Sequence, residues 1–232
     1  MSGAGELTRL DAAYRRTIDV GIRPWVYWPV RIVFSALVRL VLRPVRFGGE
    51  KIPADGPVIV AANHRSWLDP FVIALLSRRK MYFMAKSELF ENRLFGWLLG
   101  ALGVFPVRRG SADRQMITTA LAILRRGDCL MMFPEGTRTR ALHPGTPLRG
   151  IGKLALRSQA AVVPVAVAGT GASERRELGV KRVVVRAAAP TTCDSIDLDA
   201  HRPDQVLLDR VWADVERQWL AACSIARPSL QA

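Results

Sequence analysis

A strand that turns into a helix is predicted by residues 58–76, VIVAANHRSWLDPFVIALL. The apolar run 58–62 has the length and the β-branched content of a strand that is buried on both faces. A second apolar run, 71–76, follows the pair Asp69-Pro70, which is typical of the first turn of a helix. Because buried strands that alternate with helices assemble into parallel sheets, this stretch favours an α/β fold.

The same alternation continues along most of the chain. It predicts strands at 44–48, 57–62, 81–85, 103–107, 129–133, 162–167 and 182–187. It predicts helices at 70–78, 91–101, 112–126, 149–159 and 203–222. We therefore expect an α/β domain over residues 47–232, with a mostly parallel central sheet flanked by helices, after an N-terminal segment over residues 1–46.

The N-terminal segment combines apolar residues with basic ones. Between residues 20 and 46 it contains five arginines and no acidic residue. Arg31 and Arg39 interrupt its apolar run, so no stretch of roughly 20 uncharged residues is available to span a membrane. We also expect no cleaved signal peptide, because the apolar run starts far from Met1.

A helical projection of this segment favours an amphipathic helix that lies in a membrane interface. One sector of the helix holds four arginines, with apolar residues around the rest: Arg31, Arg39, Arg43 and Arg46. Three aromatic residues suited to the depth of the lipid headgroups stand near its start: Trp25, Tyr27 and Trp28. The alternative is an amphipathic helix that packs on the rest of the protein or on a second subunit.

Net charge limits the kinds of partner. The chain carries a formal net charge of +14 and is 50% hydrophobic, which favours a polyanionic partner, either nucleic acid or an anionic membrane. Most of the positive charge is arginine, which the base composition of a genome would also explain. Long apolar side chains are interleaved with the arginines, and no nucleic-acid recognition motif is present. We therefore expect an anionic membrane surface as partner and no nucleic acid.

Cysteine and histidine usage argues against disulfides and metal sites. Cys129, Cys193 and Cys223 show no paired spacing, which favours a reducing compartment and no chemical role for them. The histidines lack metal-ligand spacing, and we expect His143 and His201 in loops or on the surface. We expect no metal.

His64 and Asp69 stand between the predicted strand and the predicted helix and are candidates for a general base and its partner. An imidazole that titrates near neutrality takes a proton from an alcohol when a carboxylate fixes its tautomer and stabilises the imidazolium. Two structural alternatives exist. Asp69 could only cap the helix, and His64 could be a histidine with satisfied hydrogen bonds at a strand end.

Charged residues also follow two other predicted strands. The block 133–138, FPEGTR, offers a carboxylate, a flexible glycine and a guanidinium that can hold a polyol hydroxyl and a phosphate. Its alternative is a charged loop with a Glu-Arg ion pair. Arg108 and Arg109 come directly after the strand 103–107 and can clamp a phosphate, the alternative being a solvated strand end.

Taken together, these segments resemble the glycerolipid acyltransferase family over roughly residues 45 to 190. Four blocks occur in the order in which the family has them: 63–70, NHRSWLDP; 103–109, GVFPVRR; 133–138, FPEGTR; and 162–167, VVPVAV. Arg108 departs from the acidic or neutral residue that is common in the family, and Leu148-Arg149-Gly150 replaces a common Phe-Lys-Gly. Both departures concern the choice of acceptor headgroup.

The resemblance implies direct acyl transfer without a cofactor, at the cytoplasmic face of the membrane. An acyl thioester of coenzyme A or of acyl carrier protein would donate to the sn-2 hydroxyl of a 1-acylglycerol-3-phosphate. His64 would be the base and Asp69 its orienting partner. Acceptor binding would fall to Arg109 and Arg138 on the phosphate, to Glu135, Gly136 and Thr137, and to Pro164, which shapes the site.

Alternatives to this mechanism are few. Another lysophospholipid or a glycerol phosphate could be the acceptor, or the protein could bind lipid without catalysis. A covalent acyl-enzyme is not expected, because no Gly-x-Ser-x-Gly motif is present and Cys129 lies inside a predicted buried strand. Ser66 is a weak rival nucleophile.

Overall fold

The computed structural model describes residues 3–108 and 113–227. Within these residues a seven-stranded sheet has the order β1-β7-β6-β2-β5-β3-β4. Its strands are β1 (Val45–Phe47), β2 (Val58–Ala62), β3 (Met81–Lys86), β4 (Val104–Val107), β5 (Cys129–Met132), β6 (Ala161–Ala168) and β7 (Val184–Ala187).

The sheet is mostly parallel, as the sequence predicts. Strands β6, β2, β5, β3 and β4 all run the same way. Only β7, which is antiparallel to β6, and β1, which is parallel to β7, run in the opposite direction. Strand β2 lies between β5 and β6 and is buried along its whole length, so the residues that follow it leave the sheet at its centre.

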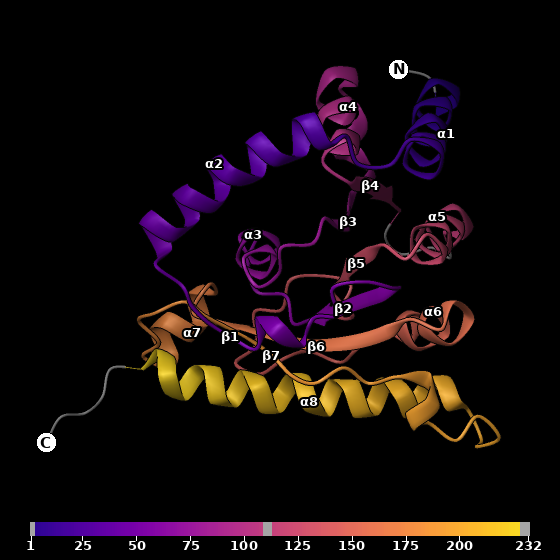
Figure 1. The fold of residues 1–232 in the computed structure, drawn as a ribbon. Helices are drawn as coiled ribbons and strands as arrows, with labels where there is room; N and C mark the ends of the chain where they lie inside the picture. Colours follow the sequence, from indigo (N-terminus) through magenta and orange to yellow (C-terminus); the bar gives the residue numbers. More distant parts are fainter. Residues whose placement is uncertain (1–2, 109–112, 228–232) are drawn as a thin grey trace, which may run out of the picture.

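Helices cover both faces of the sheet (Figure 1). They are α1 (Gly3–Asp19), α2 (Pro24–Leu42), α3 (Asp69–Ala74), α4 (Arg93–Ala101), α5 (Arg114–Arg125), α6 (Gly150–Ser158), α7 (Ala172–Glu177) and α8 (Pro203–Ala226). Side chains alternate along β2 because successive residues of a strand point to opposite faces. Ile59 and Ala61 pack with α1, α5, α6 and α8, whereas Val58, Val60 and Ala62 pack with α2 and α3.

All seven predicted strands and all five predicted helices are present, with ends shifted by a few residues. The largest shifts shorten the predicted helix 70–78 to Asp69–Ala74 and extend the predicted helix 203–222 to Ala226. Helices α1 and α7 were not predicted individually. The inward side of α1 nevertheless has a helical spacing, since Leu10, Ala13, Tyr14 and Thr17 are all buried.

The predicted division of the chain at residue 46 does not match the packing. Leu10 and Tyr14 of α1 belong to the same hydrophobic cluster as Ile59 of the central strand. The division also falls within β1, which pairs with β7. The N-terminal segment is therefore partly a component of the α/β core and not a separate unit.

The prediction that four arginines share one sector of a helix is wrong. Helix α2 ends at Leu42, and Arg43 has a φ angle of 44°, in the left-handed region that cannot continue a helix. Arg46 lies in β1 and donates to the carbonyl of Leu75 at 3.0 Å. Arg31 turns toward the protein, where its guanidinium donates to the carbonyl of Ala74 at 2.9 Å and to that of Arg79 at 2.6 Å. It also donates to the carbonyl of Ser77.

The outward face of α2 is apolar. It exposes Trp25, Ile32, Val33, Leu37, Leu40 and Val41 to more than half of their full extent. Among the described residues, α2 is the helix whose length and composition would allow it to cross a membrane, despite the two arginines that led us to expect no span. The inward face holds Tyr27 and Val38, which are buried against the core.

Candidate active site

The carboxyl ends of the parallel strands meet at one edge of the sheet, and the site lies at the centre of this edge. His64 comes two residues after β2, and Glu135 comes three residues after β5, the neighbouring strand. Asn63 fixes the end of β2 against β6, because its side-chain amide accepts from the Val167 N–H at 2.8 Å and donates to the Val167 carbonyl at 2.9 Å.

Asp69 reaches His64. Asp69 Oδ2 lies 2.9 Å from His64 Nδ1 and also accepts the backbone N–H groups of Arg65 at 2.6 Å and Ser66 at 2.7 Å. The side chain of Asp69 is completely buried, and that of His64 is 11% exposed. Because a carboxylate faces Nδ1, the proton sits on Nδ1, and Nε2 is the nitrogen that can accept a proton.

The helix-cap alternative for Asp69 does not match this geometry. The residue at the N-cap of α3 is Leu68, and no side chain caps the helix. The carboxylate of Asp69 instead turns back toward the loop that carries the histidine, although Asp69 is the first residue of α3. The imidazole of His64 stacks on Phe133 with ring centroids 4.0 Å apart, which fixes the plane of the ring.

Glu135 ties the His64 loop to the segment that follows β5. Its Oε1 accepts the backbone N–H of His64 at 2.9 Å, and its Oε2 accepts the N–H of Gly145 at 3.1 Å and the hydroxyl of Thr139. Burial raises the pKa of Glu135, although the hydrogen bonds from His64 and Gly145 partly offset this. No ion pair with Arg138 forms among the described residues, so the Glu-Arg pair considered for this loop is absent there.

The residues after Glu135 are exposed beside His64. Gly136 has a φ of +69°, and a Cβ there would lie 2.8 Å from Leu148, so this turn requires glycine. Thr137 and Arg138 are exposed, and in the described part of the chain no hydrogen bond or ion pair engages the guanidinium of Arg138. Roles of Glu135, Gly136, Thr137 and Arg138 in acceptor binding stay predictions.

Of the two other predicted binding positions, one falls outside the described residues and the other lies within the sheet. Arg109 is outside the described residues, so its role stays a prediction. The preceding residue, Arg108, follows β4, and its backbone N–H donates to Asp113 at 3.0 Å. Pro164 lies within β6 and pairs with Ala61 inside the sheet, its side chain is apolar, and its carbonyl accepts the N–H of Ala188 at 2.8 Å. Its role in shaping the site stays a prediction.

Neither rival nucleophile is placed for attack. Cys129 is buried in β5, and burial raises the pKa of its thiol to about 12. The hydroxyl of Ser66 accepts the N–H of Leu68 at 3.3 Å, and no hydrogen bond links it to His64 among the described residues. Only the imidazole of His64 therefore combines a free nitrogen with a fixed orientation in this cluster.

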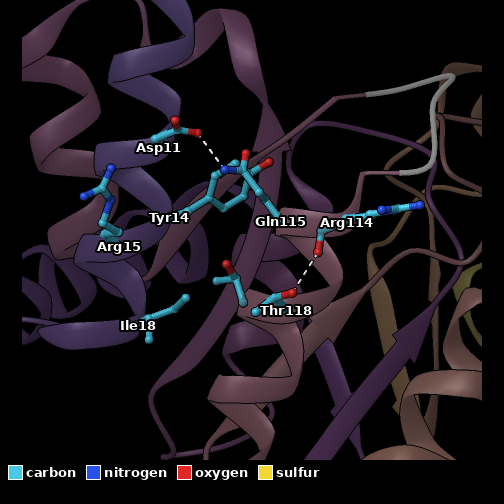
Figure 2. Close-up of a pocket in the computed structure, with 8 residues that line it drawn as sticks. Asp11, Tyr14, Arg15, Ile18, Arg114, Gln115 and Thr118 are labelled. Atoms are coloured by element: carbon cyan, nitrogen blue, oxygen red, sulfur yellow. Dashed lines mark hydrogen bonds between the residues drawn. The ribbon is translucent and has the colours of Figure 1, made fainter.

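A cavity of about 260 Å³ lies between α1 and α5, and none of the residues that line it belongs to the His64 cluster. Figure 2 shows that Arg15 and Arg114 point away from each other at its sides, while Asp11 accepts the amide of Gln115 at 2.6 Å. The lining residue Tyr14 donates to Asp113 at 2.7 Å. This bond connects α1 to the start of α5 and, through Asp113, to the end of β4.

The sequence did not identify two residues that follow β6 and contact Asp69 and Arg65. Thr170 donates to Asp69 Oδ1 at 2.6 Å, and Glu174 forms a buried ion pair with Arg65, with 3.5 Å between Oε1 and Nε. Both residues follow the block 162–167, which was the last sequence signal. A glutamate three residues after Gly171 is a capping signal for a helix start and could have located α7, but not its partner Arg65.

Comparison with known proteins gives the family. A family model described as acyltransferase matches residues 44–168, more than half of the chain. The chain belongs to the acyltransferase family. The match includes the His64 and Asp69 loop and Glu135, and ends shortly before Thr170.

Relatives of this acyltransferase differ in their acceptors. A 1-acyl-sn-glycerol-3-phosphate acyltransferase of Streptococcus pneumoniae is 36% identical over 123 residues, which cover 52% of this chain and 45% of the relative. A lyso-ornithine lipid O-acyltransferase of Pseudomonas aeruginosa is 40% identical over 128 residues, which cover 53% of this chain and 46% of the relative. The matched region is a little under half the length of these two relatives.

A solved structure shares the fold. The 1-acyl-sn-glycerophosphate acyltransferase of Thermotoga maritima matches with a TM-score of 0.64 at 23% sequence identity, covering 82% of this chain and 78% of that protein. The likeness covers a larger share of the chain than the family match does. It supports the α/β architecture described above.

Proposed function

We propose that this acyltransferase moves a fatty acyl group from a thioester to the sn-2 hydroxyl of a 1-acylglycerol-3-phosphate, which yields phosphatidic acid. The observation that carries the proposal is the pair His64 and Asp69, joined at 2.9 Å, with Nε2 of the imidazole left free at the edge of the sheet. The name of the pneumococcal relative supports the choice of acceptor.

The proposed reaction is direct transfer. His64 Nε2 takes the proton of the acceptor hydroxyl while the hydroxyl oxygen forms a bond to the thioester carbonyl carbon. The C–S bond then breaks, and the thiolate, which belongs to a thiol with a pKa of about 8.5, leaves with the electron pair. The proton on His64 passes to the thiolate, so the base is regenerated. Asp69 stabilises the imidazolium between these two steps.

Arg138 is the described residue best placed to recognise a phosphate on the acceptor. It is exposed, three residues after Glu135, whose carboxylate is bonded to the backbone of His64. An arginine at this position would hold a phosphate by paired hydrogen bonds while the neighbouring sn-2 hydroxyl faces the imidazole. Arg109 is proposed as a second phosphate ligand.

A second acceptor class is favoured by one observation, the 40% identity with a lyso-ornithine lipid acyltransferase. An ornithine headgroup carries an amine and a single carboxylate in place of the phosphate, so it offers a guanidinium less negative charge. The two acceptor classes therefore differ in how strongly activity depends on Arg138. Loss of Arg138 would weaken binding of a phosphate acceptor more than binding of an ornithine lipid.

We further propose that α2 keeps the site at an anionic membrane surface on the cytoplasmic side. Phe34 of α2 stacks on Phe71 with ring centroids 5.2 Å apart, and Phe71 contacts Trp67 edge-on at 6.2 Å. Trp67 lies between His64 and Asp69 and is 65% exposed. Apolar surface thus continues from α2 to the loop of the proposed base, which suits an acceptor that remains in the lipid layer.

Thiol release tests this function. The protein, in mixed micelles, is incubated with acyl-CoA or acyl carrier protein donors and with lysophosphatidate, lysophosphatidylcholine or lyso-ornithine lipid. We expect release with lysophosphatidate, loss of at least about a hundredfold in His64→Ala, and retained vesicle binding in that variant. Arg138→Gln should raise the KM for lysophosphatidate more than the KM for lyso-ornithine lipid. Activity with lyso-ornithine lipid only would reject the phosphate acceptor, and equal activity in His64→Ala would reject the mechanism.

A further inference from the structure

Thr170 binds the oxygen of Asp69 that His64 does not use. Its hydroxyl donates to Oδ1 at 2.6 Å, whereas Oδ2 faces His64 Nδ1. Thr170 lies in the turn between β6 and α7, about one hundred residues after Asp69 in the sequence, so the contact depends on the folded sheet. The proposed mechanism gives Thr170 no role, and Thr170 lies just beyond the matched residues 44–168.

Glu174 fixes the backbone on both sides of Thr170. Its Oε2 accepts the N–H of Gly169 at 2.8 Å and the N–H of Gly171 at 3.3 Å. Gly169 has a φ of +84°, and a Cβ there would lie 2.1 Å from the carbonyl of Arg182, so no other residue fits this turn. The hydroxyl of Thr170 is therefore presented from a turn whose conformation is closely defined.

The same carboxylate connects this turn to the loop of the proposed base. Glu174 Oε1 lies 3.5 Å from Nε of Arg65, the residue directly after His64, and accepts the indole N–H of Trp219 at 2.7 Å. The side chains of Arg65 and Glu174 are both completely buried. A buried ion pair keeps its geometry because separation would leave two uncompensated charges. The ion pair of Arg65 and Glu174 thus joins the turn that carries Thr170 to the loop that carries His64.

We propose that Thr170 is a positioning residue for acyl transfer, which holds the carboxylate of Asp69 in the orientation that receives His64 Nδ1. The proposal rests on the proposed function for its kinetic effect but not for its structural one. Among the described residues, Thr170 provides the one hydrogen bond to Oδ1, whereas Oδ2 has three donors. Without it, one oxygen of a fully buried carboxylate loses its donor, and only the contacts of Oδ2 then hold the orientation of the carboxylate toward His64.

Two substitutions separate the hydroxyl from its surroundings. Thr170→Val keeps the shape of the side chain and removes the donor, whereas Thr170→Ser keeps the donor and removes a methyl group. We expect kcat to fall about 10- to 100-fold in Thr170→Val, with the KM for the acceptor within about twofold, and to recover in Thr170→Ser. Thr118→Val, on the exposed side of α5, is the matched control and should leave both constants unchanged.

The pH profile gives a readout that loss of packing would not move. Removing the donor alters the contact between the Asp69 carboxylate and His64 Nδ1, so the acidic limb of kcat/KM should move in Thr170→Val but not in Thr170→Ser. The charged groups facing this cluster are Arg65, Glu135, Glu174 and Arg175, which donates to the carbonyl of Gly169 at 2.8 Å, and they are the same in all variants. A fall in kcat without a shift of this limb, or without rescue by serine, would overturn the proposal.

A measurement without substrate keeps the proposal independent of the acceptor. The imidazole of His64 is titrated by NMR in the wild type, Thr170→Val and Thr170→Ser, with its signal assigned by comparison with His64→Asn. We expect the midpoint to change in the valine variant alone. Equal midpoints in all three would overturn the positioning role. Absence of acyl transfer in the wild type would instead reject the proposed function, while this titration would still decide the role of Thr170.

Discussion

Asp69→Asn should preserve the loop of His64 while removing the charge that faces the imidazole. Asp69 Oδ2 accepts N–H groups from His64, Arg65 and Ser66, whereas Oδ1 accepts, within the described part of the chain, only the hydroxyl of Thr170. An asparagine will therefore place its carbonyl oxygen at the Oδ2 position and its amide at the Oδ1 position, where the hydroxyl can rotate and accept. His64 then keeps its proton on Nδ1, so charge is the main change.

The magnitude follows from the geometry of the pair. With 2.9 Å between Nδ1 and Oδ2, the centres of the imidazolium and carboxylate charges are roughly 4 Å apart. At an effective dielectric constant of about 20, two such charges attract by about 4 kcal/mol. Both side chains are almost completely buried, so salt screens little of this attraction. With about 1.4 kcal/mol for each factor of ten in rate, kcat should fall by about a thousandfold.

Steady-state thiol release measures this effect, with thermal unfolding as the check on the fold. Asp209→Asn, at an exposed position of α8, is the matched control and should behave as the wild type does. The KM for the acceptor should change little in Asp69→Asn, because the charge acts on the imidazolium and not on the bound acceptor. A kcat within about tenfold of the wild type in a folded Asp69→Asn variant would refute the reasoning.

Three further results are expected. Glu135→Gln should lower the free energy of unfolding by about 1–3 kcal/mol and should also lower kcat/KM. In either orientation of the glutamine, its NH2 group would face a buried N–H donor. Equal stability of the variant and the wild type would contradict this prediction. Leu40→Asp, on the outward face of α2, should weaken flotation of the protein with anionic vesicles. Leu220→Asp, at an exposed position of α8, is the control and should not weaken it. Equal flotation of the two variants would show that α2 does not bind the membrane. Tyr14→Phe should cost about 1.5–3 kcal/mol of unfolding free energy at pH 7, measured with denaturant, because it removes a buried hydrogen bond to a carboxylate. Burial opposes ionisation of Asp113, but hydrogen bonds, led by the one from Tyr14, outweigh the burial and lower the pKa of Asp113 below 3.8. The loss of stability in Tyr14→Phe should therefore persist above pH 3.8 and shrink as the pH falls below it. A stability difference that stays constant with pH would contradict this prediction.

Local signals in the sequence were sufficient for most of the fold. Each buried strand is a short run of apolar and β-branched residues, and such runs identify strands without knowledge of their partners. The direction of β7 was not predictable in this way, since it depends on pairing with β6 across a turn and a short helix. The end of α2 does have a signal in the sequence. Arg43 precedes Pro44, and the residue before a proline disfavours the helical conformation.

The candidate site was predictable only where its residues are close in sequence. The five-residue separation of His64 and Asp69 allowed their contact to be predicted, and the strand ends brought Glu135 to the same edge. Thr170 and Glu174 act through long-range hydrogen bonds and carry no motif of their own. The inward turn of Arg31 was also inaccessible, because a helical projection places an arginine on a sector without saying what that sector faces.

The pairing of β1 with β7 has a consequence for the order of assembly. Val45 of β1 aligns with Val184 of β7. Strand β1 therefore has no neighbour in the sheet until β7 has been synthesised. At about 5–20 residues per second, that interval lasts on the order of 10 s. During it the outward apolar face of α2 is already synthesised, and folding does not cover this face later. We therefore expect cell-free synthesis to yield more soluble, active protein when lipid vesicles are present from the start than when they are added afterwards.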